Sequence, residues 1–95
     1  MSQELKRLQE VVVPILKNAG VNRSSFFGSV ARGEERKNSD VDILIEFQGK
    51  KTLFDLVELK QALEKALERK VDLVTRRSIH PPLKEIIEKD EVSIF

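Results

Sequence analysis

The feature that most constrains how this chain can fold is the seven-residue run Val41–Phe47, in which every second residue, starting with Val41, is apolar. Successive side chains of an extended strand point to opposite faces. One face would therefore carry Val41, Ile43, Ile45 and Phe47, and the other would carry Asp42, Leu44 and Glu46. An entirely apolar strand face needs a covering layer, so the run predicts a β-sheet packed against helices.

Segments with helical spacing lie on both sides of this strand. Apolar residues at three- and four-residue steps predict a helix over about residues 3–19, with Gly20 at its end. Pro14 removes one backbone hydrogen bond, and we expect it to kink or divide that helix. Thr52 and Asp55 resemble a capping box that opens a second helix, which continues to about residue 69.

The remaining elements follow from shorter patterns. Val21–Phe27 and Val71–Thr75 read as strands, residues 76–80 as a loop, and residues 92–95 as an edge strand. Pro81 and Pro82 suit the first turn of a last helix. The expected fold is α/β (α+β), a small mixed β-sheet with helices packed on it, and residues 1–95 form a single domain.

Composition narrows the chemistry. The net charge of +1 provides no general attraction for nucleic acid or an anionic membrane, so nucleic acid is not expected as a stable partner. The chain has no Cys, which excludes thiolate catalysis and favours a hard cation held by oxygen ligands. No signal peptide or membrane span is visible, so we expect a cytoplasmic protein.

The segment between residues 26 and 46 combines two features that suit nucleotide chemistry. Gly28 and Gly33 permit tight backbone turns, and a short helix starting near Ser29 would direct free amides at phosphate. Asp40 and Asp42 lie about 7 Å apart on the same strand face, so both carboxylates can converge on metal ions. Each feature alone also fits an ordinary turn, and it is their combination that favours a phosphate and metal site.

A third carboxylate, Asp72, lies in the strand Val71–Thr75. If that strand neighbours Val41–Phe47, Asp72 can face the same site and complete a two-metal phosphoryl-transfer arrangement. Glu46 is its strongest competitor because it shares the face of Asp42, but it lies further along the strand.

Three parts of the chain together closely resemble the DNA polymerase β nucleotidyltransferase superfamily. They are Gly28-Ser29-x-x-Arg32-Gly33, then Ser39-Asp40-Val41-Asp42, then Asp72 in a later strand. The compact length looks most like the minimal nucleotidyltransferases (MNT). The resemblance implies the nucleotidyltransferase fold, with ATP as donor substrate and two Mg²⁺ ions as cofactors.

The same resemblance implies roles for individual residues. Gly28 and Ser29 would contact the nucleotide phosphates, and Ser39 would also belong to the nucleotide-binding residues. Asp40 and Asp42 would hold both metals, while Asp72 would share one metal and help to deprotonate the acceptor hydroxyl. Two roles stay open for Arg32, which could reach phosphate or brace the turn through a carboxylate or carbonyl group.

The resemblance also implies a partner. MNT proteins often accompany HEPN proteins as antitoxin and toxin, and some members transfer AMP from ATP to a tyrosine of the HEPN toxin. The alternative is a non-catalytic antitoxin, or a nucleotide-binding subunit, that acts by complex formation.

We expect the other basic residues to be solvated or partner-facing: Arg36, Lys37, Lys50, Lys51, Arg69, Lys70, Arg76 and Arg77.

Overall fold

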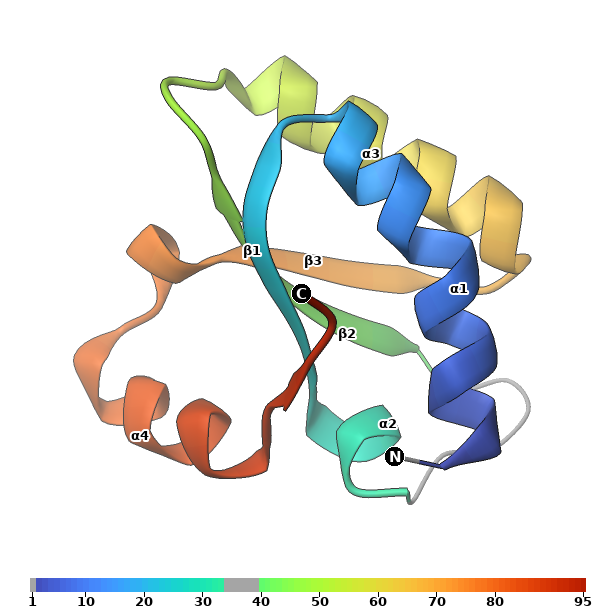
Figure 1. Ribbon diagram of the computed structural model, residues 1–95. Helices are drawn as coiled ribbons and strands as arrows, with labels where there is room; N and C mark the ends of the chain where they lie inside the picture. The colour runs from blue at the N-terminus through green and yellow to red at the C-terminus, as the bar shows by residue number, and fades with distance from the viewer. Residues whose placement is uncertain (1, 34–39) are drawn as a thin grey trace.

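The computed structural model describes residues 2–33 and 40–95 (Figure 1). In chain order its elements are α1 (Gln3–Asn18), β1 (Val21–Phe27), α2 (Gly28–Ala31), β2 (Val41–Phe47), α3 (Leu53–Leu67), β3 (Val71–Thr75), the 3-10 turn η1 (Arg76–Ser78), α4 (Pro81–Asp90) and β4 (Val92–Ser93). All predicted helices and strands are confirmed, with small shifts at their ends.

Two local expectations need correction. Helix α1 is continuous through Pro14, so a division of the helix at this residue was wrong. The second helix was expected to reach about residue 69 but ends at Leu67, because Glu68 adopts a left-handed conformation with φ 54°. The capping box is confirmed, since Thr52 Oγ1 accepts from the Asp55 amide and the Asp55 carboxylate accepts from the Thr52 amide.

The four strands form one mixed sheet in the order β3-β2-β1-β4. Strand β1 is antiparallel to both β2 and β4, while β2 and β3 are parallel. The parallel pair is connected through α3, which crosses one face of the sheet. The last strand is short, and its pairing with Ser25 and Phe26 confirms the expected edge strand.

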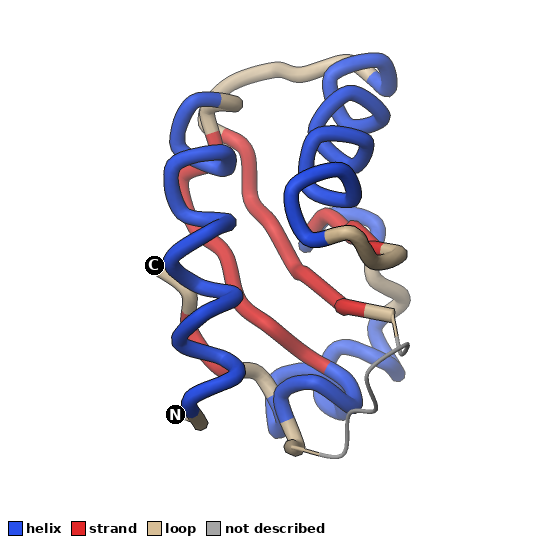
Figure 2. Tube along the Cα trace, turned by 90° about the vertical axis from the view of Figure 1, so that its right-hand side faces the viewer, coloured by secondary structure: helices blue, strands red, loops and turns tan. Residues whose placement is uncertain are grey.

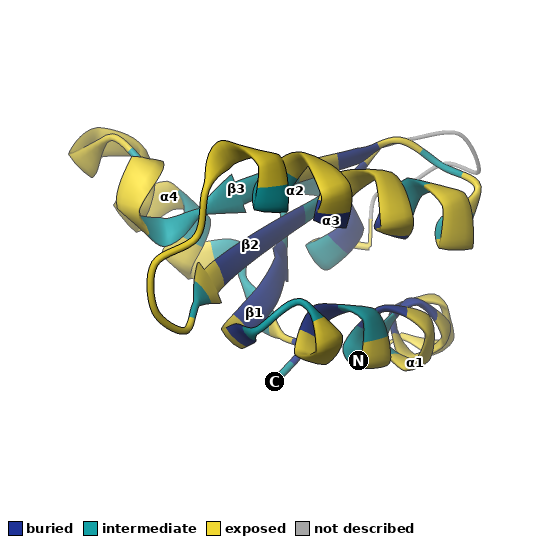
Figure 3. Cartoon of the chain, turned by 90° about the horizontal axis from the view of Figure 1, so that it is seen from above, coloured by how far each residue is buried: buried dark blue, intermediate teal, exposed yellow. Residues whose placement is uncertain are grey.

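Helices α1 and α3 lie side by side on one face of the sheet (Figures 2 and 3). Their apolar faces enclose the core with the helix-facing residues of β1, β2 and β3, among them Leu16, Phe26, Ile43, Leu63 and Val71. No helix in the described part of the chain is long and apolar enough to cross a membrane.

The opposite sheet face is held to the C-terminal segment by a polar network. Glu91 Oε1 accepts a hydrogen bond from Ser25 Oγ at 3.0 Å and pairs with Arg76 Nη2 at 2.8 Å. Burial raises the pKa of Glu91, but the bonds from Arg76 and Ser25 outweigh that effect and hold the pKa below its ordinary value. Arg76 was expected to be solvated or partner-facing, and the structure contradicts the solvated alternative, because its side chain is largely buried.

This network predicts that Glu91→Gln lowers the free energy of unfolding by about 1 kcal/mol near neutral pH, because the neutral side chain loses a charge-assisted pair. A lowered carboxyl pKa stabilises the fold above the unfolded value of 4.5, and that contribution is lost as pH falls through the folded value. Urea unfolding near pH 7 and near pH 3 should show the difference shrinking in acid. Glu88→Gln on exposed α4 surface is the control, and an equal loss at both pH values would contradict the prediction.

Candidate active site

Two aspartates lie next to each other on the parallel strands. In the register of β2 with β3, Asp42 is the direct partner of Asp72, and on its other side Asp42 is the partner of Phe27, the last residue of β1. Asp42 is partly buried and Asp72 is exposed. The expectation that Asp72 lies on a neighbouring strand beside Asp42 is therefore confirmed, and Asp40 directly precedes β2.

Burial and the neighbouring carboxylates raise the pKa of Asp42 to about 6. Burial is the largest cause, followed by the negative charges of Asp72 and Asp40, while Arg32 acts in the opposite direction. Asp72 and Asp40 thus lie close enough to disfavour the charged form of Asp42. A divalent cation would offset this repulsion, so the donor set fits the magnesium that the sequence predicts.

Gly28 brings the turn after β1 against Asp42. It has φ +69°, a conformation that favours glycine, and it opens the short helix α2. A Cβ at this position would overlap with Asp42 Oδ2 and lie 3.1 Å from Asp42 Cγ. The close approach therefore places the start of α2, including the partly buried Ser29, next to the aspartates.

Arg32 ends α2 and pairs with a carboxylate from the C-terminal helix. Its Nη1 lies 3.1 Å from Asp90 Oδ2, and it makes further interactions. Of the two roles predicted for Arg32, bracing of the turn through a carboxylate is the contact that the structure contains. Ser39, a predicted nucleotide-binding residue, lies outside the described residues, as do Arg36 and Lys37.

Asp40, Asp42 and Asp72 lie near one another, but their side chains are not arranged around one common metal position. Within residues 2–33 and 40–95, no group of three or more His, Cys, Asp or Glu side chains is arranged to hold a metal ion. Glu46 lies further along β2 and is exposed, where it lines a groove away from Asp42. His80 precedes α4 and accepts hydrogen bonds from Leu83 and Lys84 through its backbone carbonyl.

The sequence interpretation missed the network around Arg76. The signal was available, because Asp72, Val74 and Arg76 alternate and would share one sheet face. What the pattern could not indicate is the partner Glu91, which reaches this face only after α4 has returned the chain to β1.

The fold and the aspartate positions can now be compared with known proteins. The family described as "Nucleotidyltransferase domain" matches residues 5–94. The chain belongs to this nucleotidyltransferase family.

Two relatives match most of the chain. "Putative protein adenylyltransferase MJ0435" of Methanocaldococcus jannaschii is 46% identical over 91 residues, which cover 96% of this chain and 98% of the relative. "Protein adenylyltransferase MntA" of Thermococcus cleftensis is 36% identical over 75 residues, covering 79% of this chain and 76% of the relative.

Two solved structures extend the comparison to the fold. One described as "putative minimal nucleotidyltransferase" has a TM-score of 0.83 at 39% identity, covering 95% of this chain and 92% of that chain. A "toxin-antitoxin with AMP-PNP" has a TM-score of 0.82 at 26% identity, covering 92% of this chain and 72% of that chain. The expected nucleotidyltransferase fold and the resemblance to minimal nucleotidyltransferases are thereby confirmed.

The contact between Gly28 and Asp42 in this nucleotidyltransferase predicts that Gly28→Ala destabilises the protein more than Gly33→Ala. Both glycines have positive φ, +69° and +73°, but a Cβ on Gly33 meets nothing within 4 Å. We expect the Gly28 variant to lose at least about 1 kcal/mol more than the Gly33 variant, since the carboxylate must move. Thermal and urea unfolding of the two variants would check this, and equal losses would contradict the steric account.

The raised pKa of Asp42 predicts a pH-dependent gain in stability from Asp42→Asn. The pKa of the Asp42 carboxyl rises from 3.8 to about 6 on folding. Protonation of this carboxyl therefore stabilises the fold at low pH. This stabilisation is complete below pH 3.8 and is lost as pH rises through about 6. The partly exposed side chain reduces the effect, and we expect Asp42→Asn to stabilise the protein by about 1 kcal/mol above that range. Urea unfolding of the wild type and of Asp42→Asn in EDTA, from below pH 3.8 to above pH 6, would check this, with Asp55→Asn as a comparison. A stability difference that does not change with pH would contradict the raised pKa of Asp42.

Proposed function

We propose that this chain is a protein adenylyltransferase that transfers AMP from ATP to a hydroxyl group of a partner protein. Its partner would be a HEPN-type toxin, and the chain would act as the antitoxin. The observation that carries the proposal is the direct pairing of Asp42 with Asp72 beside the Gly28 turn. Two relatives are named protein adenylyltransferases, and a structural neighbour is a toxin–antitoxin complex with AMP-PNP.

We assign the binding roles at the aspartates and the Gly28 turn as the resemblance to the nucleotidyltransferases implies. Asp40 and Asp42 would hold two Mg²⁺ ions, and Asp72 would share one of them. Bound there, Mg²⁺ supplies charge compensation for the aspartates and for the oxygens of the transferring phosphoryl group. Gly28 and Ser29, at the start of α2, would contact the nucleotide phosphates. Arg32 would keep this turn in place through its pair with Asp90.

The reaction requires a base near the acceptor. The acceptor hydroxyl oxygen attacks the α-phosphorus of ATP, a new P–O bond forms, and the bond to pyrophosphate breaks. Asp72 is exposed and would accept the hydroxyl proton as this bond forms. Asp42 is less suited to this role because its neighbours and the polypeptide partly enclose it.

Incubation with α-labelled ATP, Mg²⁺ and the product of the neighbouring gene should label that product with AMP. Asp42→Asn should lower the labelling at least about 100-fold, because a metal ligand is lost. Glu10→Gln, on the exposed face of α1 across the sheet, is the matched control and should label like the wild type.

The outcomes separate the proposal from its alternatives. Undiminished labelling by Asp42→Asn would refute the assigned role of this residue. A second outcome is a complex in which the toxin is inactive, while mass spectrometry finds no added AMP on either chain. In that case the protein acts by complex formation and is a non-catalytic antitoxin. Labelling that needs a third component would favour a nucleotide-binding subunit.

A further inference from the structure

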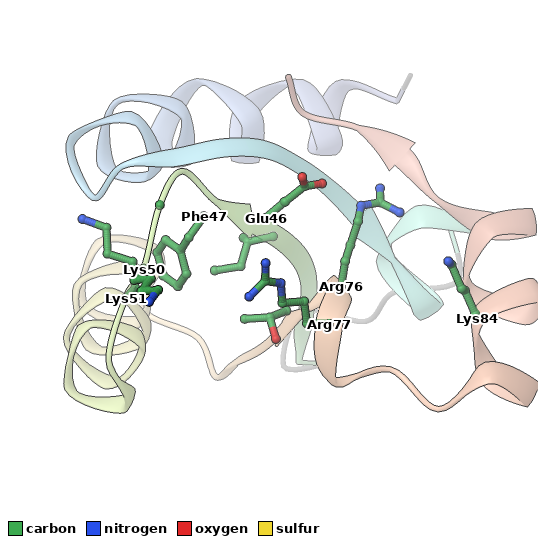
Figure 4. A pocket seen from close by; sticks show the side chains of 10 residues that line it. Glu46, Phe47, Lys50, Lys51, Arg76, Arg77 and Lys84 are labelled. Atoms are coloured by element: carbon green, nitrogen blue, oxygen red, sulfur yellow. The ribbon is translucent and has the colours of Figure 1, made fainter.

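A groove that the proposed reaction does not use lies at the carboxyl ends of β2 and β3 (Figure 4). It has a volume of about 730 Å³. Lys50 and Lys51 lie on one side, near the start of α3, and Lys84 lies on the other side, on α4. Arg77 lies between them, so side chains from three separate segments surround one hollow.

The groove is strongly basic although the chain as a whole has a net charge of only +1. Its charged lining consists of Lys50, Lys51, Arg76, Arg77 and Lys84 against one carboxylate, Glu46. Glu91 compensates Arg76 through a 2.8 Å ion pair. The other four cations are on exposed residues, so the groove would attract an anionic group.

Large apolar side chains adjoin the cations on both sides. Leu53 and Phe54 come two and three residues after Lys51 and are 74% and 82% exposed. Leu83 and Ile86 flank Lys84 on α4 and are 52% and 60% exposed. Exposed apolar surface next to cations is typical of a protein-binding surface, whereas a nucleic-acid backbone is held chiefly by cations. The occupant that fits both features is a protein segment that carries acidic and apolar residues.

The position of the groove relates it to the aspartates. Glu46 shares a strand and a face with Asp42, and at about 3.3 Å per residue the two lie roughly 13 Å apart along β2. An extended segment of about four residues covers the same length. Leu44 lies between Asp42 and Glu46 on this face and is fully buried, so a chain docked in the groove would pass over the Arg76–Glu91 pair to reach the corner where Asp42 and Asp72 meet, and four residues is the lower limit.

We propose that this basic groove docks an acidic segment of the acceptor protein, at least about four residues away from the hydroxyl that receives AMP. This inference rests on the proposed protein adenylylation, because it assigns the groove to the acceptor. Docking at the cations positions the acceptor hydroxyl and selects partners that carry acidic residues at this spacing.

Binding of a synthetic peptide tests the docking without any transfer step. The peptide has one tyrosine, with a Glu-Glu-Leu sequence about four positions to each side, as the strand spacing requires. Its comparison peptide has Gln in place of every Glu. Fluorescence anisotropy compares the wild type with Lys50→Glu/Lys84→Glu, which reverses one charge on each side of the groove. Lys60→Glu/Lys65→Glu, on exposed positions of α3 outside the groove lining, is the charge-matched control.

We expect the groove variant to bind the Glu peptide at least about tenfold more weakly than the wild type, and the control variant to bind within about threefold of it. The Gln peptide should bind weakly to all three proteins, and binding of Mg-ATP should be the same for all three. Circular dichroism and thermal unfolding confirm that each variant is folded.

Three results would overturn the docking proposal. The first is wild-type protein that does not bind the Glu peptide, or a groove variant that binds it equally well. The second is a parallel loss of Mg-ATP binding, which would make the groove part of the nucleotide site. The third is binding of a labelled oligouridylate as tight as that of the Glu peptide, which would indicate an RNA surface. Peptide binding without any AMP transfer to the partner would instead refute the proposed function and leave the docking intact.

Discussion

The site depends on one pairing, in which parallel strands β2 and β3 place Asp42 directly beside Asp72. Burial, followed by the negative charges of Asp72 and Asp40, raises the pKa of Asp42. The same strands turn Ile43 and Val71 toward α1 and α3, where they are buried in the apolar core. Burial on the helix face therefore holds together a strand pair whose other face brings carboxylates close to one another.

Gly28 connects this pairing to the phosphate side of the site. The missing side chain lets the turn touch the Asp42 carboxylate, and the positive φ directs the chain at once into α2. The turn after β1 and the strand β2, which are separate in the sequence, thus lie in direct contact. Each limits the position of the other, which explains why the short motif requires glycine at this point.

Local patterns predicted the elements well and their partners less well. The alternation in Val41–Phe47 gave the bounds of β2 because one apolar face requires period two. The parallel register of β2 with β3 depends on how α3 packs, which no short pattern contains. Arg76 has the right parity for the sheet face, but its burial depends on Glu91, which α4 brings back from later in the chain. The groove likewise combines three distant segments.

The C-terminal segment links the two ends of the sheet face that lies opposite α1 and α3. Its adjacent residues Asp90 and Glu91 bind Arg32, at the phosphate turn, and Arg76, at the basic groove. Two neighbouring carboxylates therefore hold one arginine from each functional region, while α4 also contributes Lys84 to the groove. A displacement of α4 would change the support of the turn and the shape of the groove together, so the proposed donor and acceptor regions would share one structural anchor.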